Sequence, residues 1–209
     1  MTSFDLEAGL PERTFFAFGA GRVAFRDTGL RSDCPPLLLV HGLGSSSLTW
    51  TRLVARLPSD RRIILVDLPG FGKSDAVDPV SLGGFGDAIV ALLTQLEVER
   101  AVWIGHSMGG QVSILQALAQ PALFERLFLI APAGLERFSS QEGRLLRAAV
   151  TTSGIKRQRR KDVAANVRLA FDRWVPEAEA LVDARMAIVG EELDRYAATF
   201  KASSIACTD

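Results

Sequence analysis

The five residues Gly105-His106-Ser107-Met108-Gly109 form the pattern G-x-S-x-G, in which a serine can act as a nucleophile. A short apolar run at residues 101–104 precedes the pattern, and a helical pattern over residues 108–120 follows it. A serine at such a sharp strand-to-helix turn has strained backbone, so the residues two positions away must be small, and both are glycine. Backbone strain of about 1–3 kcal/mol is usually retained at functional turns. Ser107 is therefore the candidate catalytic nucleophile.

A second glycine-containing loop, His41-Gly42-Leu43-Gly44-Ser45, directly follows an apolar run at residues 37–40. Taken alone, its glycines fit a tight turn into the next helix. Paired with the serine pattern, they indicate a loop that aims a backbone N–H at the carbonyl under attack. We expect the N–H groups of Leu43 and Met108 to form the oxyanion hole, aided by the positive end of the helix that begins at residue 108. Four residues are expected to support this loop and turn: Gly42, Gly105, His106 and Gly109.

A third stretch, residues 67–75, invites a competing hypothesis, because its Gly-Lys-Ser after a strand resembles a phosphate-binding loop. Such a loop needs a glycine five residues before Gly72, and Asp67 stands there. Its carboxylate would repel and crowd the phosphates. A dinucleotide-binding pattern fails as well, because its third glycine would fall on Asp75. We therefore expect no nucleotide cofactor.

The elements that must position these residues can be predicted from hydrophobic patterns. Two β-prone runs at residues 13–18 and 22–27 predict an antiparallel hairpin. Short apolar runs that alternate with helical periodicity predict parallel strands buried on both faces by crossover helices. These strands are expected at residues 37–40, 63–66, 101–104 and 127–131. The helices between them are expected at residues 48–57, 81–97 and 108–120.

After Pro132 and Gly134 the pattern becomes helical only. Helices are expected at residues 142–150, 163–174 and 177–200. The sequence thus predicts an α/β core over residues 1–134 and a separate helical part over residues 135–209. Between these helices, the basic run at residues 156–161 is expected to be a solvated surface.

The three motifs, in this order, resemble those of the α/β-hydrolase superfamily over roughly residues 13–200. They are the His-Gly loop, the Asp-x-x-Gly-x-Gly-x-Ser stretch from Asp67, and the Gly-His-Ser-Met-Gly-Gly turn. The resemblance implies a mostly parallel sheet of strand order 1-2-4-3-5-6-7-8 with flanking helices and a helical cap, here residues 135–209. A serine nucleophile implies esterase, lipase-like, peroxidase-type or C–C bond hydrolase relatives. It argues against the aspartate-nucleophile branches, which are epoxide hydrolases and haloalkane dehalogenases.

The sequence departs from the family at the general base. The family's triad runs in chain order serine, acid, histidine, but His41 and His106 are the only histidines and both precede Ser107. His41 belongs to the oxyanion loop, and the side chain of His106 is expected to point away from the nucleophile, so neither is an expected base. The chain ends within the helical part, so the last two strands of the fold are expected to be missing.

Three explanations stay open: a truncated, nearly inactive hydrolase, a non-catalytic small-molecule-binding protein on the same fold, and an unorthodox Ser-Lys type of dyad. No lysine after Ser107 can be placed near it, whereas Glu136, shortly after the last predicted strand, is an alternative acid. Without the last two strands, residues 127–131 would form an exposed, uncharged sheet edge. This edge predicts self-association of the chain.

The amino-acid composition limits the classes of molecule that the protein is expected to bind. Lys plus Arg equals Asp plus Glu at 24 each among 209 residues, which disfavours nucleic acid and anionic membranes as partners. We expect a small, mostly apolar substrate and no cofactor. Cys34 and Cys207 lack metal-ligand spacing, so no metal site is expected, and two free thiols fit a reducing compartment. The absence of a secretory signal pattern and of a membrane-length apolar run predicts a cytoplasmic protein.

Overall fold

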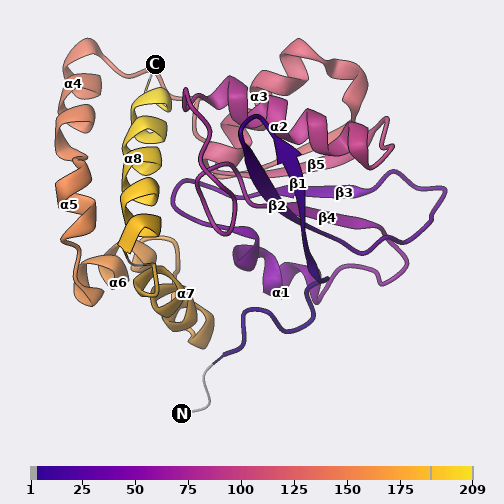
Figure 1. Ribbon diagram of the computed structural model, residues 1–209, viewed down its shortest axis with the longest axis horizontal. Coiled ribbons are helices and arrows are strands. Elements are labelled where there is room, and N and C mark those ends of the chain that lie inside the picture. Colours follow the sequence, from indigo (N-terminus) through magenta and orange to yellow (C-terminus); the bar gives the residue numbers. More distant parts are fainter. Residues whose placement is uncertain (1–3, 189, 209) are drawn as a thin grey trace.

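The computed structural model describes residues 4–188 and 190–208 and contains one sheet with strand order β1-β2-β4-β3-β5-β6 (Figure 1). β1 (Arg13–Phe18) and β2 (Gly21–Asp27) form the predicted antiparallel hairpin, and β2 continues antiparallel onto β4. The other four strands are mutually parallel, as predicted: β3 (Leu37–Val40), β4 (Ile63–Val66), β5 (Ala101–His106) and β6 (Phe124–Ile130). The observed order agrees with the first six strands that the family resemblance implies.

Helices cover both faces of the sheet because successive side chains of a strand point to opposite faces. One face presents Leu38, Val40, Ile64, Val66 and Trp103 to helices α2 (Leu82–Gln95) and α3 (Met108–Ala119). The other face presents Leu37, Leu39, Ile63, Leu65 and Val102 to the 3₁₀-helix η1 (Ser47–Trp50) and to α1 (Thr51–Val54). In Figure 1, α2 and α3 lie on one side of the sheet and α1 on the other.

Local signals set the ends of the core helices. The Ser81 side chain caps α2 by accepting a hydrogen bond of 3.0 Å from the Gly84 N–H. α3 ends before Pro121, which begins the 3₁₀-helix η2 (Pro121–Leu123). The single helix expected at residues 48–57 is wrong, because η1 and a one-turn α1 occupy this stretch. The Thr51 hydroxyl shares its one hydrogen between Leu48 O (2.8 Å) and Leu6 O (2.6 Å), and such hydrogen bonds to backbone compete with a regular helix.

The part of the chain after β6 is helical, as predicted, but its helices have other bounds than those expected. It contains α4 (Ser140–Ala149), α5 (Thr152–Lys156), α6 (Arg160–Arg168), α7 (Pro176–Met186) and α8 (Gly190–Ala206). The one helix expected at residues 177–200 is two helices, and α8 begins at Gly190, whose φ of +59° a continuous helix does not allow. α6 ends at Arg168 instead of continuing to residue 174, and α5, capped by Thr151, was not predicted.

The helical part lies beside the sheet (Figure 1), next to the carboxyl ends of the parallel strands. Tyr196 and Ala197 of α8 and Ile155 of α5 belong to the same hydrophobic cluster as α2 and α3. A buried Glu177 on α7 also pairs with Arg52 of α1 at 3.0 Å. The division expected between residues 134 and 135 remains a prediction. Across the described residues, no helix combines the length and apolar character needed to cross a membrane.

Candidate active site

Ser107 occupies the turn between β5 and α3 and has φ 52° and ψ −122°. Non-glycine residues rarely adopt this positive φ, and holding one there costs about 1–3 kcal/mol. Backbone hydrogen bonds fix the turn: the Ser107 N–H donates to Ile130 O at 3.1 Å, and Ser107 O accepts from the N–H groups of Gly110 (2.9 Å) and Ala133 (3.1 Å). The neighbouring strand and the first turn of α3 therefore hold the strained serine.

The glycines around Ser107 allow backbone segments to meet. A Cβ at Gly105 would lie 2.7 Å from both Gly109 O and Gly110 Cα, and a Cβ at Gly109 would collide with the carbonyl groups of Val40 and His41. Real Cβ atoms do not approach backbone this closely. Only glycine lets β5, the start of α3 and the end of β3 pack together at this point.

The loop after β3 lies directly against the serine, since a Cβ at Gly42 would be 3.0 Å from Ser107 Cβ. The loop forms a tight turn in which the Ser45 N–H donates to Gly42 O at 3.3 Å and Gly44 has a φ of +68°. His41 Nδ1 also contacts Gly42 O at 2.8 Å. Because the peptide unit is planar and trans, fixing Gly42 O also fixes the opposite direction of the Leu43 N–H.

Two backbone N–H groups beside Ser107 are unused. Across residues 4–188 and 190–208, neither the Leu43 nor the Met108 N–H donates to a protein acceptor. Met108 is buried and forms the first residue of α3, where a helix exposes N–H groups and partial positive charge. An unpaired N–H is costly away from water. Both N–H groups could donate a hydrogen bond to a substrate oxygen that becomes negative next to Ser107.

His41 is fully buried, and both of its ring nitrogens contact backbone. The Leu68 N–H donates to Nε2 at 2.9 Å, so Nε2 is the unprotonated nitrogen and Nδ1 carries the hydrogen donated to Gly42 O. Burial lowers the pKa of His41, outweighing the opposite effect of Asp67. This histidine stays neutral and joins two loops, so it has no nitrogen left to accept a proton from Ser107.

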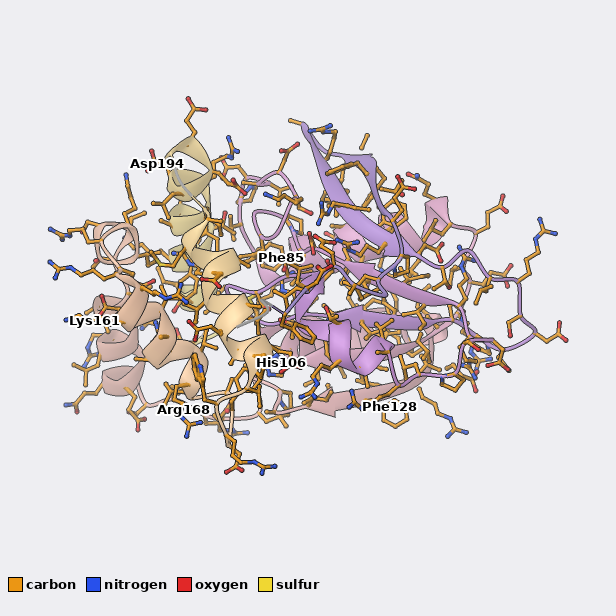
Figure 2. The ribbon with its side chains drawn as sticks, turned by 90° about the horizontal axis from the view of Figure 1, so that it is seen from below. Phe85, His106, Phe128, Lys161, Arg168 and Asp194 are labelled. Carbon is orange, nitrogen blue, oxygen red and sulfur yellow. The ribbon has the colours of Figure 1, made fainter. Side chains whose placement is uncertain are left out.

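His106 lies at the end of the sheet that faces the helical part (Figure 2). Its ring packs edge-on against Trp50 with 6.5 Å between centroids, and a Cβ at Gly42 would lie 3.1 Å from its Nδ1. Nδ1 is buried and finds no hydrogen-bond partner among the described residues. Burial lowers the pKa of His106. The ring therefore fills space under the loop as a neutral group.

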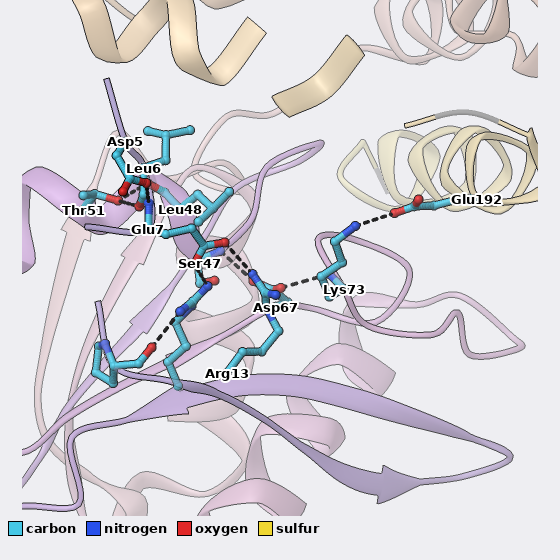
Figure 3. Close-up of polar contacts among 12 residues, drawn as sticks. Asp5, Leu6, Glu7, Arg13, Ser47, Leu48, Thr51, Asp67, Lys73 and Glu192 are labelled. Carbon is cyan, nitrogen blue, oxygen red and sulfur yellow. Dashed lines mark hydrogen bonds and ion pairs between the residues drawn. The ribbon is translucent and has the colours of Figure 1, made fainter. Parts of the chain in front are cut away.

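The loop from Asp67 folds around its own carboxylate (Figure 3). Asp67 Oδ1 accepts from the Ser47 N–H at 2.7 Å, and Oδ2 accepts from the Lys73 N–H at 3.0 Å. A Cβ at Gly72 would collide with this carboxylate. The space where a phosphate loop would hold an anion is thus occupied by Asp67, which instead ties the segment that begins η1 to the loop after β4.

Sequence reasoning missed the role of α8, which contacts both loops. Tyr196 Oη donates to Gly44 O at 3.3 Å, and Thr199 packs on Gly70. The available signal was the aromatic pair Tyr196 and Phe200, four residues apart on one helix face. One other expectation remains open: Glu136, the alternative acid, is exposed in the loop after β6. Among the described residues, no group of three His, Cys, Asp or Glu could hold a metal ion.

Known proteins are similar to this chain in sequence. A profile of the Alpha/beta hydrolase family matches residues 37–205. The pimeloyl-(acyl-carrier protein) methyl ester esterase of Pectobacterium atrosepticum is 40% identical over 106 residues, which cover 51% of this chain and 39% of that enzyme. The matched stretches span only 33–40% of the lengths of the first curated relatives.

Solved structures agree over more of the chain. A hydrolase from Pseudomonas aeruginosa superposes with a TM-score of 0.73 at 25% identity, covering 94% of this chain and 72% of that one. An N-acyl homoserine lactonase superposes with a TM-score of 0.62 at 23% identity, covering 89% of this chain and 67% of the lactonase, which supports the fold alone. Because the family profile matches residues 37–205, which are most of this chain, the chain belongs to the alpha/beta hydrolase family.

Proposed function

We propose that this chain carries the nucleophile and oxyanion hole of a serine hydrolase that cleaves an ester or a related acyl or C–C bond. One observation carries the proposal: a strained Ser107 with two unpaired N–H groups beside it, those of Leu43 and Met108. Ser107 Oγ would attack the substrate carbonyl, and the two N–H groups would donate to the oxygen as it becomes negative. The similarity to a methyl ester esterase supports ester substrates.

The substrate proposed is small, mostly apolar and uncharged, because the chain has a formal net charge of +0 and offers no overall field for an ion. No cofactor is proposed for the reaction. Two free cysteines, Cys34 and Cys207, support action in the cytoplasm, where thiols stay reduced.

The chain's own histidines supply no general base in this proposal. Both nitrogens of His41 are engaged, and His106 is packed beneath the oxyanion loop. A serine hydroxyl without a base is a weak nucleophile. We therefore propose that the 209-residue chain by itself turns over very slowly, with a remainder that comes from the oxyanion hole and binding.

An added base provides the test. Hydrolysis of p-nitrophenyl butyrate by the purified chain is measured with increasing imidazole, and the reaction of imidazole alone is subtracted. We expect an imidazole-dependent rate that disappears in Ser107→Ala and persists in the control Ser140→Ala, which changes an exposed serine at the start of α4. An equal rate in Ser107→Ala and in the unchanged chain would overturn the proposal.

The second candidate is a non-catalytic module that binds small molecules on the same fold, favoured by the lack of an available histidine. It predicts that an apolar ester binds with the same affinity to the chain and to Ser107→Ala, with no Ser107-dependent hydrolysis at any imidazole concentration. Calorimetric titration with a non-hydrolysable ketone analogue of the ester separates the two candidates.

A further inference from the structure

Helix α8 contacts the outer side of the turn that carries the Leu43 N–H. The Tyr196 hydroxyl donates to Gly44 O at 3.3 Å. A Cβ at Gly44 would lie 2.6 Å from Cε2 of Phe200 and 2.7 Å from the hydroxyl oxygen of Tyr196. The two aromatic side chains therefore occupy the space beside the turn, and Gly44 must remain glycine for both its φ of +68° and this contact.

Tyr196 is itself firmly placed. Its side chain is buried, packs edge-on against Phe71 with 5.8 Å between centroids, and carries the Arg185 guanidinium 3.9 Å from its ring centroid. Phe71 packs edge-on against His41 at 6.0 Å. Burial raises the pKa of Tyr196, so the hydroxyl keeps the proton that it donates to Gly44 O at neutral pH.

The turn is thus held at two points by different parts of the chain. On the core side, His41 and the Ser45 N–H hold Gly42 O. On the side of the helical part, Tyr196 holds Gly44 O. The Leu43 N–H belongs to the same planar peptide unit as Gly42 O. The Gly44 carbonyl lies two peptide units further along the same turn, so the hydrogen bond from Tyr196 acts on the Leu43 N–H through the backbone torsion angles of Leu43 and Gly44.

We propose that Tyr196 is a positioning residue for the oxyanion hole: its hydroxyl holds the Gly44 carbonyl and so keeps the Leu43 N–H aimed at the oxygen that becomes negative. The inference rests on the proposed function, and it assigns to α8 a part in the reaction that packing alone does not require. Tyr196 touches no reacting atom. It acts only through the turn.

The size of the effect follows from the donor that is displaced. Removing one oxyanion donor lowers kcat by about 10²–10³, and a displacement of about 1 Å can have a similar effect. Loss of the Tyr196 hydroxyl leaves the Gly42 anchor in place, so we expect a smaller effect, about tenfold on kcat with KM unchanged.

Tyr196→Phe is the informative variant because it removes the hydroxyl and keeps the ring. Its matched control is Glu192→Gln, which breaks the 3.3 Å ion pair between α8 and Lys73 (Figure 3) without touching the turn. Imidazole-supported hydrolysis is measured for a p-nitrophenyl ester and for the corresponding thionoester. Because N–H donors stabilise O⁻ better than S⁻, the ester-to-thionoester rate ratio reports the aim of the donors.

We expect Tyr196→Phe to lower kcat for the ester about tenfold and to lower the ester-to-thionoester ratio, whereas Glu192→Gln changes neither. Unchanged kcat and ratio in Tyr196→Phe, with Ser107→Ala still inactive, would overturn the inference and leave the proposed function standing. Activity that survives Ser107→Ala would instead overturn the proposed function.

If activity survives Ser107→Ala, a measurement that does not depend on turnover still tests the role of Tyr196. The amide resonance of Leu43 is compared between the chain and both variants in ¹⁵N–¹H spectra. We expect it to shift in Tyr196→Phe and to stay unchanged in Glu192→Gln, with the Met108 amide unchanged in both. A Leu43 amide that does not respond to Tyr196→Phe would show that the hydroxyl does not set its environment.

Discussion

The space beside Gly109 is filled by backbone, which makes this position intolerant of any side chain. A Cβ there would collide with the carbonyl groups of Val40 and His41 at the end of β3. These groups cannot move without displacing the strand and the loop that follows it. We expect Gly109→Ala to lower the free energy of unfolding by about 1–3 kcal/mol, as measured by urea denaturation.

Gly83 offers a matched control because it is also the second residue of its helix, α2. No atom outside its own helix and chain neighbours lies within 4 Å of a Cβ built on it. Gly83→Ala is expected to leave the stability unchanged or to raise it by up to about 1 kcal/mol. Equal destabilisation by both changes would mean that the close approach at Gly109 does not determine the outcome.

Protonation of His41 is expected to make the fold sensitive to acid. Its folded-state pKa lies below the ordinary value of about 6.5, because burial disfavours the charged ring and Nε2 already accepts from the Leu68 N–H. The unfolded chain therefore takes up a proton near pH 6.5 while the folded chain does not. Stability is complete above that pH and decreases as pH falls from about 6.5 toward the folded pKa.

His106, whose pKa is also lowered by burial, contributes in the same direction. Urea unfolding at pH 7.5, 6.5 and 5.5 measures the slope, and His41→Gln and His106→Gln should each reduce it. A slope that is the same in the unchanged chain and in both variants would assign the acid sensitivity to carboxylates instead.

At the scale of elements, the strands could be predicted where burial on both faces makes every residue apolar. β3 and β4 have the predicted bounds for this reason. β5 continues past residue 104 to His106, and β6 begins at Phe124, three residues before the expected start, where Glu125 and Arg126 interrupt the apolar run. Charged residues are tolerated there because β6 is an edge strand with one side open to solvent.

The contacts of α8 could not be predicted, because they join residues far apart in the chain. Tyr196 and Gly44 are separated by 152 positions, and no local pattern shows that they meet. Ser107 was easier to identify, since its strain, its glycines and its helix are all encoded within a few residues. Local patterns thus identified the candidate nucleophile, while the contacts of α8 with the loop after β3 emerged only from tertiary packing.

For the whole molecule, the outer edge of the sheet is the most unusual surface. In the described part of the chain, β6 pairs only with β5, so its other edge presents unpaired N–H and C=O groups. Phe128, Leu129 and Ile130 are exposed by 52%, 38% and 43%, and Figure 2 shows Phe128 projecting from the outside of this strand. Leu115 and Leu118 of α3 are exposed as well, at 42% and 78%.

We propose that this edge causes the 209-residue chain to self-associate, because the uncharged, apolar second half of β6, residues 127–130, is a template for pairing and a formal net charge of +0 supplies no repulsion. Size-exclusion chromatography should show species larger than a monomer that increase with concentration. Phe128→Lys should shift elution to the monomer position, since a lysine on the edge opposes pairing.

Leu169→Lys is the control, because Leu169 is 88% exposed at the end of α6, away from the sheet. A monomer at every concentration, or an equal effect of both lysines, would refute pairing through β6.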